Sequence, residues 1–293
     1  MSQPLVSQEL GSLTNWFSEQ LAAILEGKRR MMSARTTALA TLRGSIERLE
    51  AHGGAHAPRR VALGHAEADA ALQGGLAMGA VHEVFAEAGR HSAAATGFVA
   101  GLAGRVAPRR PLLWIRQDFC EREAGALSMS GLAELGLDPR SLVTVRTADV
   151  EATLQASADA LACDALGAVV LEVWGETPKL DLVASRKLTL AAQASGVTAL
   201  LLRIAATPNP STAETRWIAR AAHSPPSAPW TAWGAPIFDA ELVRNRHGLN
   251  GRWIMEWKCD ERLFTEPAAD SQPLAAMPAH RPHQAGAKLR RAG

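Results

Sequence analysis

The chain has 293 residues, and its composition of 47% apolar and 20% charged residues is ordinary for a folded globular protein, which excludes disorder along the whole length. Its formal net charge of +2 gives no strong overall field, so composition alone does not indicate a nucleic-acid-binding protein. The three cysteines, Cys120, Cys163 and Cys259, lie far apart, and neither a metal site nor a disulfide framework is predicted. No apolar run approaches the roughly 20 residues that span a bilayer, and the N-terminus lacks a signal-peptide pattern. We therefore expect a cytoplasmic protein with one main domain.

The first 57 residues are predicted to form a helical segment that precedes the main domain. Two apolar stripes recur at three- and four-residue spacing, which is the pattern of amphipathic helices. Whether these stripes pack on their own domain or bind a partner helix stays open. The sequence also leaves open whether Met1 or the pair Met31 and Met32 is the true start. The stripes are Leu10, Leu13, Phe17, Leu21 and Ile24, followed by Leu39, Leu42, Ile46 and Leu49.

The main domain is predicted over residues 58–265, where apolar runs of strand length alternate with helical patterns. Near-continuous apolar strands joined by helices are typical of a parallel sheet covered on both faces, so we predict an α/β fold. The expected strands are residues 80–85, 111–117, 142–146, 166–174 and 197–204, and the expected helices are residues 94–106, 150–163 and 180–195.

The C-terminal part of the chain is predicted to change character three times. A stretch from Ala205 to Pro236 that contains several prolines is expected to be rich in loops. Residues 237–246 and 252–258 flank a turn that contains Gly and Asn, and they are expected to form a closing β-hairpin. The tail, residues 266–293, is rich in Pro, Ala and His, has a basic end and is predicted to be disordered.

The most specific pattern in the chain leads into the first strand of the main domain. Leu63-Gly64, the run from Leu72 to Leu76, and the run from Gly79 to Phe85 together resemble the entry to the RecA-family ATPase core. The resemblance implies a RecA-like, mostly parallel sheet flanked by helices. It also aligns the family's phosphate loop with the residues from Ala86 to Ala93.

The side chains that a phosphate loop needs are missing from this stretch. In the motif G-x-x-x-x-G-K-[ST], glycines let backbone N–H groups surround the phosphates, the lysine neutralises charge and the hydroxyl holds magnesium. Loss of the lysine contact alone costs roughly 1.5–3 kcal/mol, so we expect no ATP cofactor and no enzymatic activity. Arg90 as a substitute cation, and hence a RecA-type ATPase with an unorthodox loop, is the alternative. The degenerate loop comprises Ala86, Gly89, Arg90, His91, Ser92 and Ala93.

Two acidic residues stand at positions that resemble catalytic positions of the family. Asp118 follows a predicted strand, near the position of the family's water-activating glutamate, and Glu172 stands where the Walker B strand has an aspartate. A carboxylate at a strand end can organise magnesium or activate water. Without a phosphate loop there is no phosphate to attack, so we interpret both carboxylates as vestigial or structural.

Two arginines near the end of the main domain resemble a trans-acting element. Val243-Arg244-Asn245-Arg246 resembles the RecA "VKNK" element, whose cations reach ATP bound on the neighbouring subunit of a filament. The resemblance implies a partner or trans-nucleotide interface at Arg244 and Arg246. A solvated strand edge is the alternative, since charged edge strands protect sheets against aggregation.

Five further segments carry a closer resemblance: His82 to Phe85, Ala93 to Phe98, Thr215 to Trp217, Leu242 to Gly248, and Trp253. In these segments the sequence is similar to the ImuA family within the RecA superfamily. The resemblance implies a role in SOS-induced translesion synthesis alongside ImuB, with an error-prone replicative-type polymerase involved indirectly, and the degenerate loop makes that role non-catalytic. RecA as a partner is our own hypothesis from the residues: a RecA-like subunit that lacks a phosphate loop but keeps the cations Arg244 and Arg246 could cap the end of a RecA filament.

Binding of single-stranded DNA is a third interpretation. Trp217, Trp230 and Trp233 are interleaved with Arg216 and Arg220, and aromatic and cationic side chains together can form a platform on which bases stack. Tryptophans that pack beneath a long loop would give the same pattern. The two interpretations differ in whether the indoles are exposed.

Overall fold

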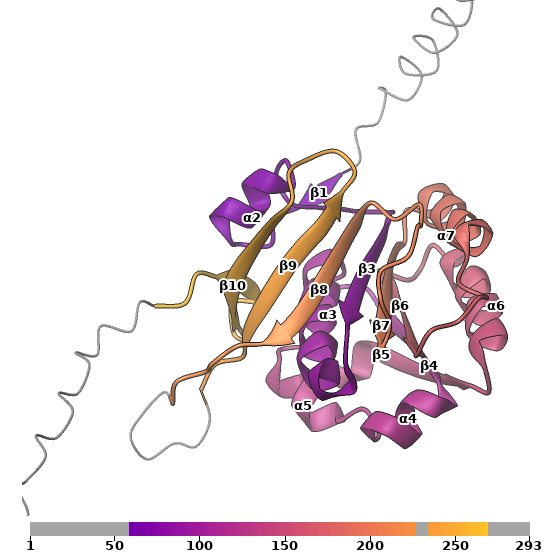
Figure 1. Ribbon diagram of the computed structural model, residues 1–293, viewed down its shortest axis with the longest axis horizontal. Helices are drawn as coiled ribbons and strands as arrows, with labels where there is room; N and C mark the ends of the chain where they lie inside the picture. Colours follow the sequence, from indigo (N-terminus) through magenta and orange to yellow (C-terminus); the bar gives the residue numbers. More distant parts are fainter. Residues whose placement is uncertain (1–58, 227–233, 269–293) are drawn as a thin grey trace, which may run out of the picture. The chain divides into compact units, whose positions relative to one another are not determined.

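The computed structural model describes residues 59–226 and 234–268. The helical segment predicted over residues 1–57, most of the predicted tail, and Trp230 and Trp233 lie outside these ranges. Within the described residues, nine strands form one sheet in the order β5-β4-β6-β7-β3-β8-β9-β10-β11 (Figure 1).

Six neighbouring strands of this sheet are parallel, and they include all five strands that the sequence predicts. The predicted hairpin is also confirmed, because β9 (Ile237–Asn245) and β10 (Gly251–Lys258) pair in antiparallel register and extend the sheet beyond β8. A short last strand, β11 (Leu263–Thr265), pairs with β10. The parallel strands are β5 (Leu142–Thr147), β4 (Leu112–Gln117), β6 (Ala168–Trp174), β7 (Thr198–Ile204), β3 (Val81–Ala86) and β8 (Thr215–Ala221).

Helices cover both faces of the parallel strands, as the near-continuous apolar pattern predicts. On β6, Ala168 and Val170 join the core beneath α3 (Ser92–Val106), whereas Val169 and Leu171 join the core beneath α6 (Val150–Leu161) and α7 (Leu182–Ser195). In Figure 1, α6 and α7 lie side by side. The sheet order and the helical layers give an α/β RecA-like fold.

Helix α3 approaches the antiparallel strands closely because glycines lie on the face that it buries. A Cβ atom on Gly97 would lie 3.3 Å from the Phe238 ring, and one on Gly101 would lie 2.6 Å from Cζ of Phe264. Phe98 of the same helix packs against both rings, with centroid separations of 5.8 and 5.2 Å. The glycines therefore allow an aromatic core to form between α3 and the antiparallel strands.

The loop-rich stretch from Ala205 to Pro236 contains a strand that the sequence analysis does not predict, β8 (Thr215–Ala221). Trp217 and Ala219 of this strand are buried in the core beneath α3. The prolines lie on either side of the strand and not within it. Their local frequency indicates a loop, although the seven residues between them form β8.

Several short elements have no clear sequence signal. β1 (Arg60–Val61) and β2 (Leu76–Ala77) form a separate two-stranded sheet. The short helices are α2 (Ala66–Ala71), α4 (Asp118–Ala124) and α5 (Met129–Glu134).

None of the described helices is long and apolar enough to cross a membrane.

Candidate functional site

The degenerate phosphate loop occupies the connection between β3 and α3, at the carboxyl edge of the parallel strands. Ala86 ends β3 and is fully buried, a 3-10 turn runs from Gly89 to His91, and α3 begins at Ser92. The position is the one at which an open α/β sheet binds ligands. The frame of the loop is therefore present, and its backbone and neighbours decide what it can hold.

The backbone of the loop does not form an anion-binding nest. A nest needs successive N–H groups in alternating right- and left-handed conformations, and no residue from Ala86 to Ala93 has a positive φ. Gly89 is the single glycine in this range, and it lies in the 3-10 turn. The loop thus lacks both the side chains and the backbone shape that surround a phosphate.

Two contacts, one from β8 and one from the end of β6, hold the loop. The Glu87 carboxylate accepts a hydrogen bond from Arg220 of β8, with Oε2 and Nη2 2.7 Å apart. Trp174, the last residue of β6, packs its indole over Gly89, where a Cβ atom would lie 3.1 Å from Cζ2. An acidic side chain in the loop and an indole against its glycine are both unfavourable for a triphosphate.

A hollow of about 310 Å³ lies beside the N-terminus of α3. Ser92, Ala93 and Thr96 of the helix line one side, and the residues from Ala124 to Ser128 line another. Arg116 is the only charged residue among those lining it, and its guanidinium is already paired with a carboxylate. The hollow therefore presents no free cation to an anionic ligand.

Glu172, the predicted vestigial acid, lies in a buried polar network. Arg116 of β4 donates from Nε to Oε2 at 2.8 Å and from Nη2 to Oε1 at 3.0 Å, and the Trp114 indole donates to Oε2 at 2.8 Å. Glu172 is 1% exposed. With both oxygens accepting hydrogen bonds and almost no access to solvent, this carboxylate is poorly placed to bind magnesium or activate water.

Asp118, the second predicted acid, begins α4 near the end of β4. Its Oδ1 accepts a hydrogen bond from Arg146 of β5 at 3.0 Å, and Glu121 accepts a second from the same guanidinium at 3.3 Å. Asp118 therefore belongs to a partly exposed ion-pair cluster at the edge of the sheet. No described contact joins it to Glu172.

The residues proposed for DNA contact lie on opposite faces of β8. Trp217 is fully buried and packs against Phe98 and Trp253. Arg216 is also buried, and its Nε donates to Glu83 Oε2 at 2.7 Å. Since strand neighbours point to opposite faces, these two side chains cannot join one surface platform.

A second buried arginine lies close to Arg216. Arg203 of β7 is 1% exposed, and its guanidinium lies 5.6 Å from the centroid of the Phe85 ring, while that of Arg216 lies 5.8 Å from it. Burial lowers the pKa of Arg203, and the carboxylates of Glu176 and Glu83 oppose this effect. The two arginines are held in the protein by cation–π contacts and acidic partners.

Arg244 and Arg246 lie at the amino edge of the parallel strands, away from the degenerate loop. Arg244 pairs in register with Arg216 near the start of β8, and its Nη1 donates to the Ser211 carbonyl at 2.5 Å. Arg246 is exposed, and its backbone N–H donates to Glu214. The two cations therefore do not reach the loop of their own chain, and Arg246 faces solvent.

Sequence reasoning missed three parts of this site: the indole of Trp174 against the loop, the pairing of Arg220 with Glu87, and Arg116. A signal existed for Arg116. It lies opposite Glu172 in the register of β4 with β6, and both are charged residues in otherwise apolar strands. Two opposite charges at equivalent positions of neighbouring buried strands indicate an ion pair. The Trp174 contact had no comparable signal.

Fold and site together define a RecA-like protein in which the backbone between β3 and α3 does not form an anion-binding nest. No protein-family model matches the sequence. The chain is similar to Protein ImuA of Caulobacter vibrioides in two strains, NA1000 and CB 15. In each case it is 30% identical over 197 residues, which cover 62% of this chain and 77% of the relative. The chain belongs to the ImuA family, and at the level of the family its role lies in the SOS mutagenesis machinery.

Proposed function

We propose that this protein is a non-catalytic, RecA-like adaptor of SOS-induced translesion synthesis that binds ImuB and RecA and does not bind ATP. The proposal depends on the loop between β3 and α3, which lacks the shape of a phosphate site. Its backbone has no positive φ, Glu87 is paired with Arg220, and the Trp174 indole packs on Gly89. A protein that keeps the RecA-like body without a phosphate site is suited to protein–protein contacts.

Equilibrium binding of a fluorescent ATP analogue with magnesium tests the non-catalytic part. If the protein is a non-catalytic adaptor, we expect no saturable rise in the fluorescence anisotropy of the analogue at concentrations that saturate RecA under the same conditions. The competing ATPase function relies on Arg90, so Arg90→Ala is the matched variant. Saturable binding to the wild-type chain that Arg90→Ala removes would establish an unorthodox ATP site and contradict the adaptor.

The proposed contact with RecA depends on Arg244 and Arg246, which lie at the carboxyl end of β9, beside the start of β8. This protein would dock on the nucleotide face of the last RecA subunit in a filament. Because it binds no ATP itself, it would offer no nucleotide to a further RecA subunit, so the filament would end there. Arg246→Ala tests the exposed cation alone, and Arg244→Ala with Arg246→Ala tests both. Exposed Arg140 provides the matched control, Arg140→Ala.

Retention on immobilised RecA filaments, formed with a slowly hydrolysed ATP analogue, measures this contact. We expect both cation variants to lose retention while Arg140→Ala keeps it. Unchanged retention of the double variant would contradict the end-cap. Co-purification with ImuB is a separate measurement, and its failure with a folded wild-type chain would contradict the adaptor function itself.

A further inference from the structure

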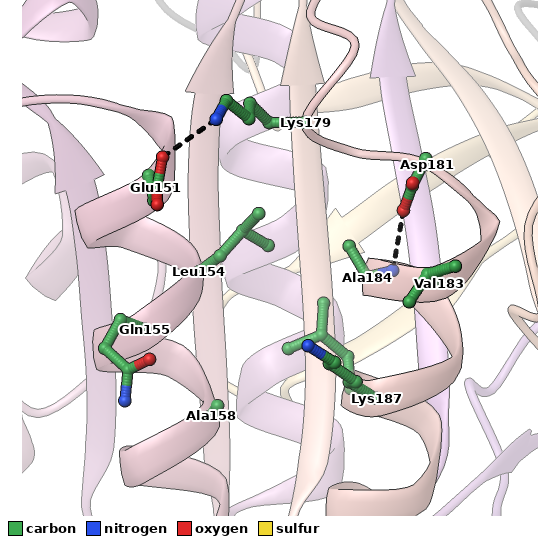
Figure 2. A pocket seen from close by; sticks show the side chains of 10 residues that line it. Glu151, Leu154, Gln155, Ala158, Lys179, Asp181, Val183, Ala184 and Lys187 are labelled. Atoms are coloured by element: carbon green, nitrogen blue, oxygen red, sulfur yellow. Dashed lines mark hydrogen bonds and ion pairs between the residues drawn. The ribbon is translucent and has the colours of Figure 1, made fainter.

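Helix α7 exposes an unusual concentration of apolar side chains. Leu182, Val183 and Leu190 are 54%, 62% and 50% exposed, although the opposite side of the helix is buried against the sheet. Beside them, a hollow of about 360 Å³ separates α7 from α6. Figure 2 shows Leu154 and Ala158 of α6 on one side of this hollow and Val183 and Ala184 of α7 on the other. We call this surface the α6/α7 face.

The two sides of the α6/α7 face carry opposite charge. Glu151 and Asp159 are exposed on α6. On the α7 side, Lys179 precedes the helix, Arg186 and Lys187 are exposed, and the sequence of α7 from Leu182 to Ser195 has no acidic residue. Asp181, the N-cap residue, adds one exposed carboxylate to this side, and its Oδ1 accepts a hydrogen bond from the Ala184 N–H at 2.8 Å, so cations still outnumber carboxylates there. Figure 2 shows Lys179 reaching across the hollow to Glu151, with Nζ and Oε2 2.9 Å apart. An apolar centre thus lies between an acidic side and a basic side.

We propose that the α6/α7 face is a self-association surface whose occupant is the same face of a second copy of this chain. A two-fold axis that runs along the hollow, in the plane of the contact, would place α6 of each copy over α7 of the other. The acidic side of one copy then meets the basic side of its partner, twice, around a shared apolar centre. This is the self-complementarity that an isologous contact requires.

The positions of the charges along the helices fit this arrangement. α6 and α7 follow parallel strands, and in Figure 2 the first turn of α7, at Val183 and Ala184, lies beside Leu154 of α6, beyond Glu151. At a rise of 1.5 Å per residue, Asp159 lies about 12 Å beyond Glu151, and Lys187 lies about 6 Å beyond Val183. Rotation about an axis along the hollow does not change the position of a residue along the helices. Lys187 of one copy therefore lies between Glu151 and Asp159 of the other.

The charge separation also argues against other occupants. A partner that is uniformly acidic would be repelled by Glu151 and Asp159, and a uniformly basic partner would be repelled by Arg186 and Lys187. A two-fold axis across the helices would place α6 on α6 and repeat the same conflict. A second copy with its axis along the hollow satisfies both sides at once. This inference does not depend on the proposed adaptor function.

Sedimentation equilibrium of the full chain at about 1 to 100 micromolar tests the proposal, a range that detects micromolar affinity. One variant makes α7 acidic, with Arg186→Glu and Lys187→Glu, and a second makes α6 basic, with Glu151→Lys and Asp159→Lys. We expect the wild-type chain to dimerise and each variant alone to lose at least tenfold in dimer affinity. An equimolar mixture of the two should dimerise again, because each acidic side then meets a basic one.

Two further variants separate this surface from others. Val183→Asp places a charge in the apolar centre and should prevent association, whereas Arg140→Glu reverses an exposed charge on another element and should leave it unchanged. Circular dichroism establishes that each variant is folded. A wild-type chain that stays monomeric, association that survives Val183→Asp, or a charge-swapped mixture that stays monomeric would each overturn the proposal. A monomeric chain that Val183→Asp destabilises would instead indicate that a segment of the same chain covers the face.

Discussion

Arg116 and Glu172 form a bidentate ion pair between β4 and β6, two strands that are otherwise apolar. Both side chains are buried, at 6% and 1% exposure, and they lie directly opposite each other in the strand register. Glu172 is the residue that the resemblance to RecA-family ATPases aligns with the Walker B aspartate. In this protein the same carboxylate is bound to a protein cation.

Removing one partner of this pair should destabilise the fold strongly. We expect Arg116→Met to lower the free energy of unfolding by about 3–5 kcal/mol, because the Glu172 carboxylate would stay buried without its counter-charge. Arg116→Met combined with Glu172→Gln should recover part of this loss, since the amide is neutral and its oxygen can still accept from the Trp114 indole. Urea denaturation measures both. Equal losses for the single and double variants would contradict the ion-pair account.

Stability should fall on mild acidification because of a buried histidine in β3. His82 Nδ1 lies 2.8 Å from the Thr215 hydroxyl, and Nε2 lies 2.7 Å from the Ala77 carbonyl. Since a carbonyl only accepts, Nε2 carries the proton, and the Thr215 hydroxyl, which accepts from the Trp217 indole, donates to Nδ1. Burial lowers the pKa of His82 from 6.5 to about 4.

The sign of the pH effect follows from this lowered pKa. Above pH 6.5 His82 is neutral in both the folded and the unfolded chain, and its contribution is constant. Between pH 6.5 and about 4 only the unfolded chain takes up the proton, so this residue alone should lower the free energy of unfolding by about 3 kcal/mol across that window. Urea titrations at several pH values, compared with His82→Gln, isolate this part. Parallel pH profiles for the two proteins would contradict it.

Two glycines on α3 should respond differently to the same substitution. Gly→Ala inside a helix ordinarily stabilises by up to about 1 kcal/mol. A Cβ atom on Gly101 would lie 2.6 Å from the Phe264 ring, which is itself packed against Trp257, so Gly101→Ala should destabilise the protein. On Gly104 the nearest atom is 3.3 Å away at the end of the Leu137 side chain, so Gly104→Ala should be neutral or slightly stabilising. Thermal unfolding would reveal the contrast, and equal melting temperatures would contradict it.

Arg216 provides a test between the structural and the DNA-binding interpretations. Its guanidinium pairs with buried Glu83 and donates to the Ser211 hydroxyl at 2.7 Å. We therefore expect Arg216→Met to lower the free energy of unfolding by about 3–5 kcal/mol. A DNA contact would instead leave stability unchanged and reduce the salt dependence of oligonucleotide affinity by roughly one phosphate contact. Denaturation and binding titrations of the same variant decide between the two.

The local elements of the main domain could be predicted because their signals are local. Residues 166–174 are predicted as a buried strand and residues 150–163 as a helix, and the structure has β6 at Ala168–Trp174 and α6 at Val150–Leu161. These predictions succeed because side-chain direction repeats every 2.0 or 3.6 residues whatever the partner is. The loss of the phosphate loop could also be read directly, because it concerns which side chains stand at Ala86 to Ala93. β8 is not predicted as a strand, because the prolines on either side of it indicate a loop.

What the sequence by itself determined was the α/β alternation, the closing hairpin and the absence of phosphate-binding side chains. Only the tertiary structure decided that Trp174 packs on Gly89, that Glu172 pairs with Arg116 from 56 positions away, and that Glu83 pairs with Arg216 from 133 away. The physical reason is that a side chain's identity and period are properties of the chain. The partner that satisfies a buried charge, and the surface left exposed between α6 and α7, are set by how the strands and helices pack.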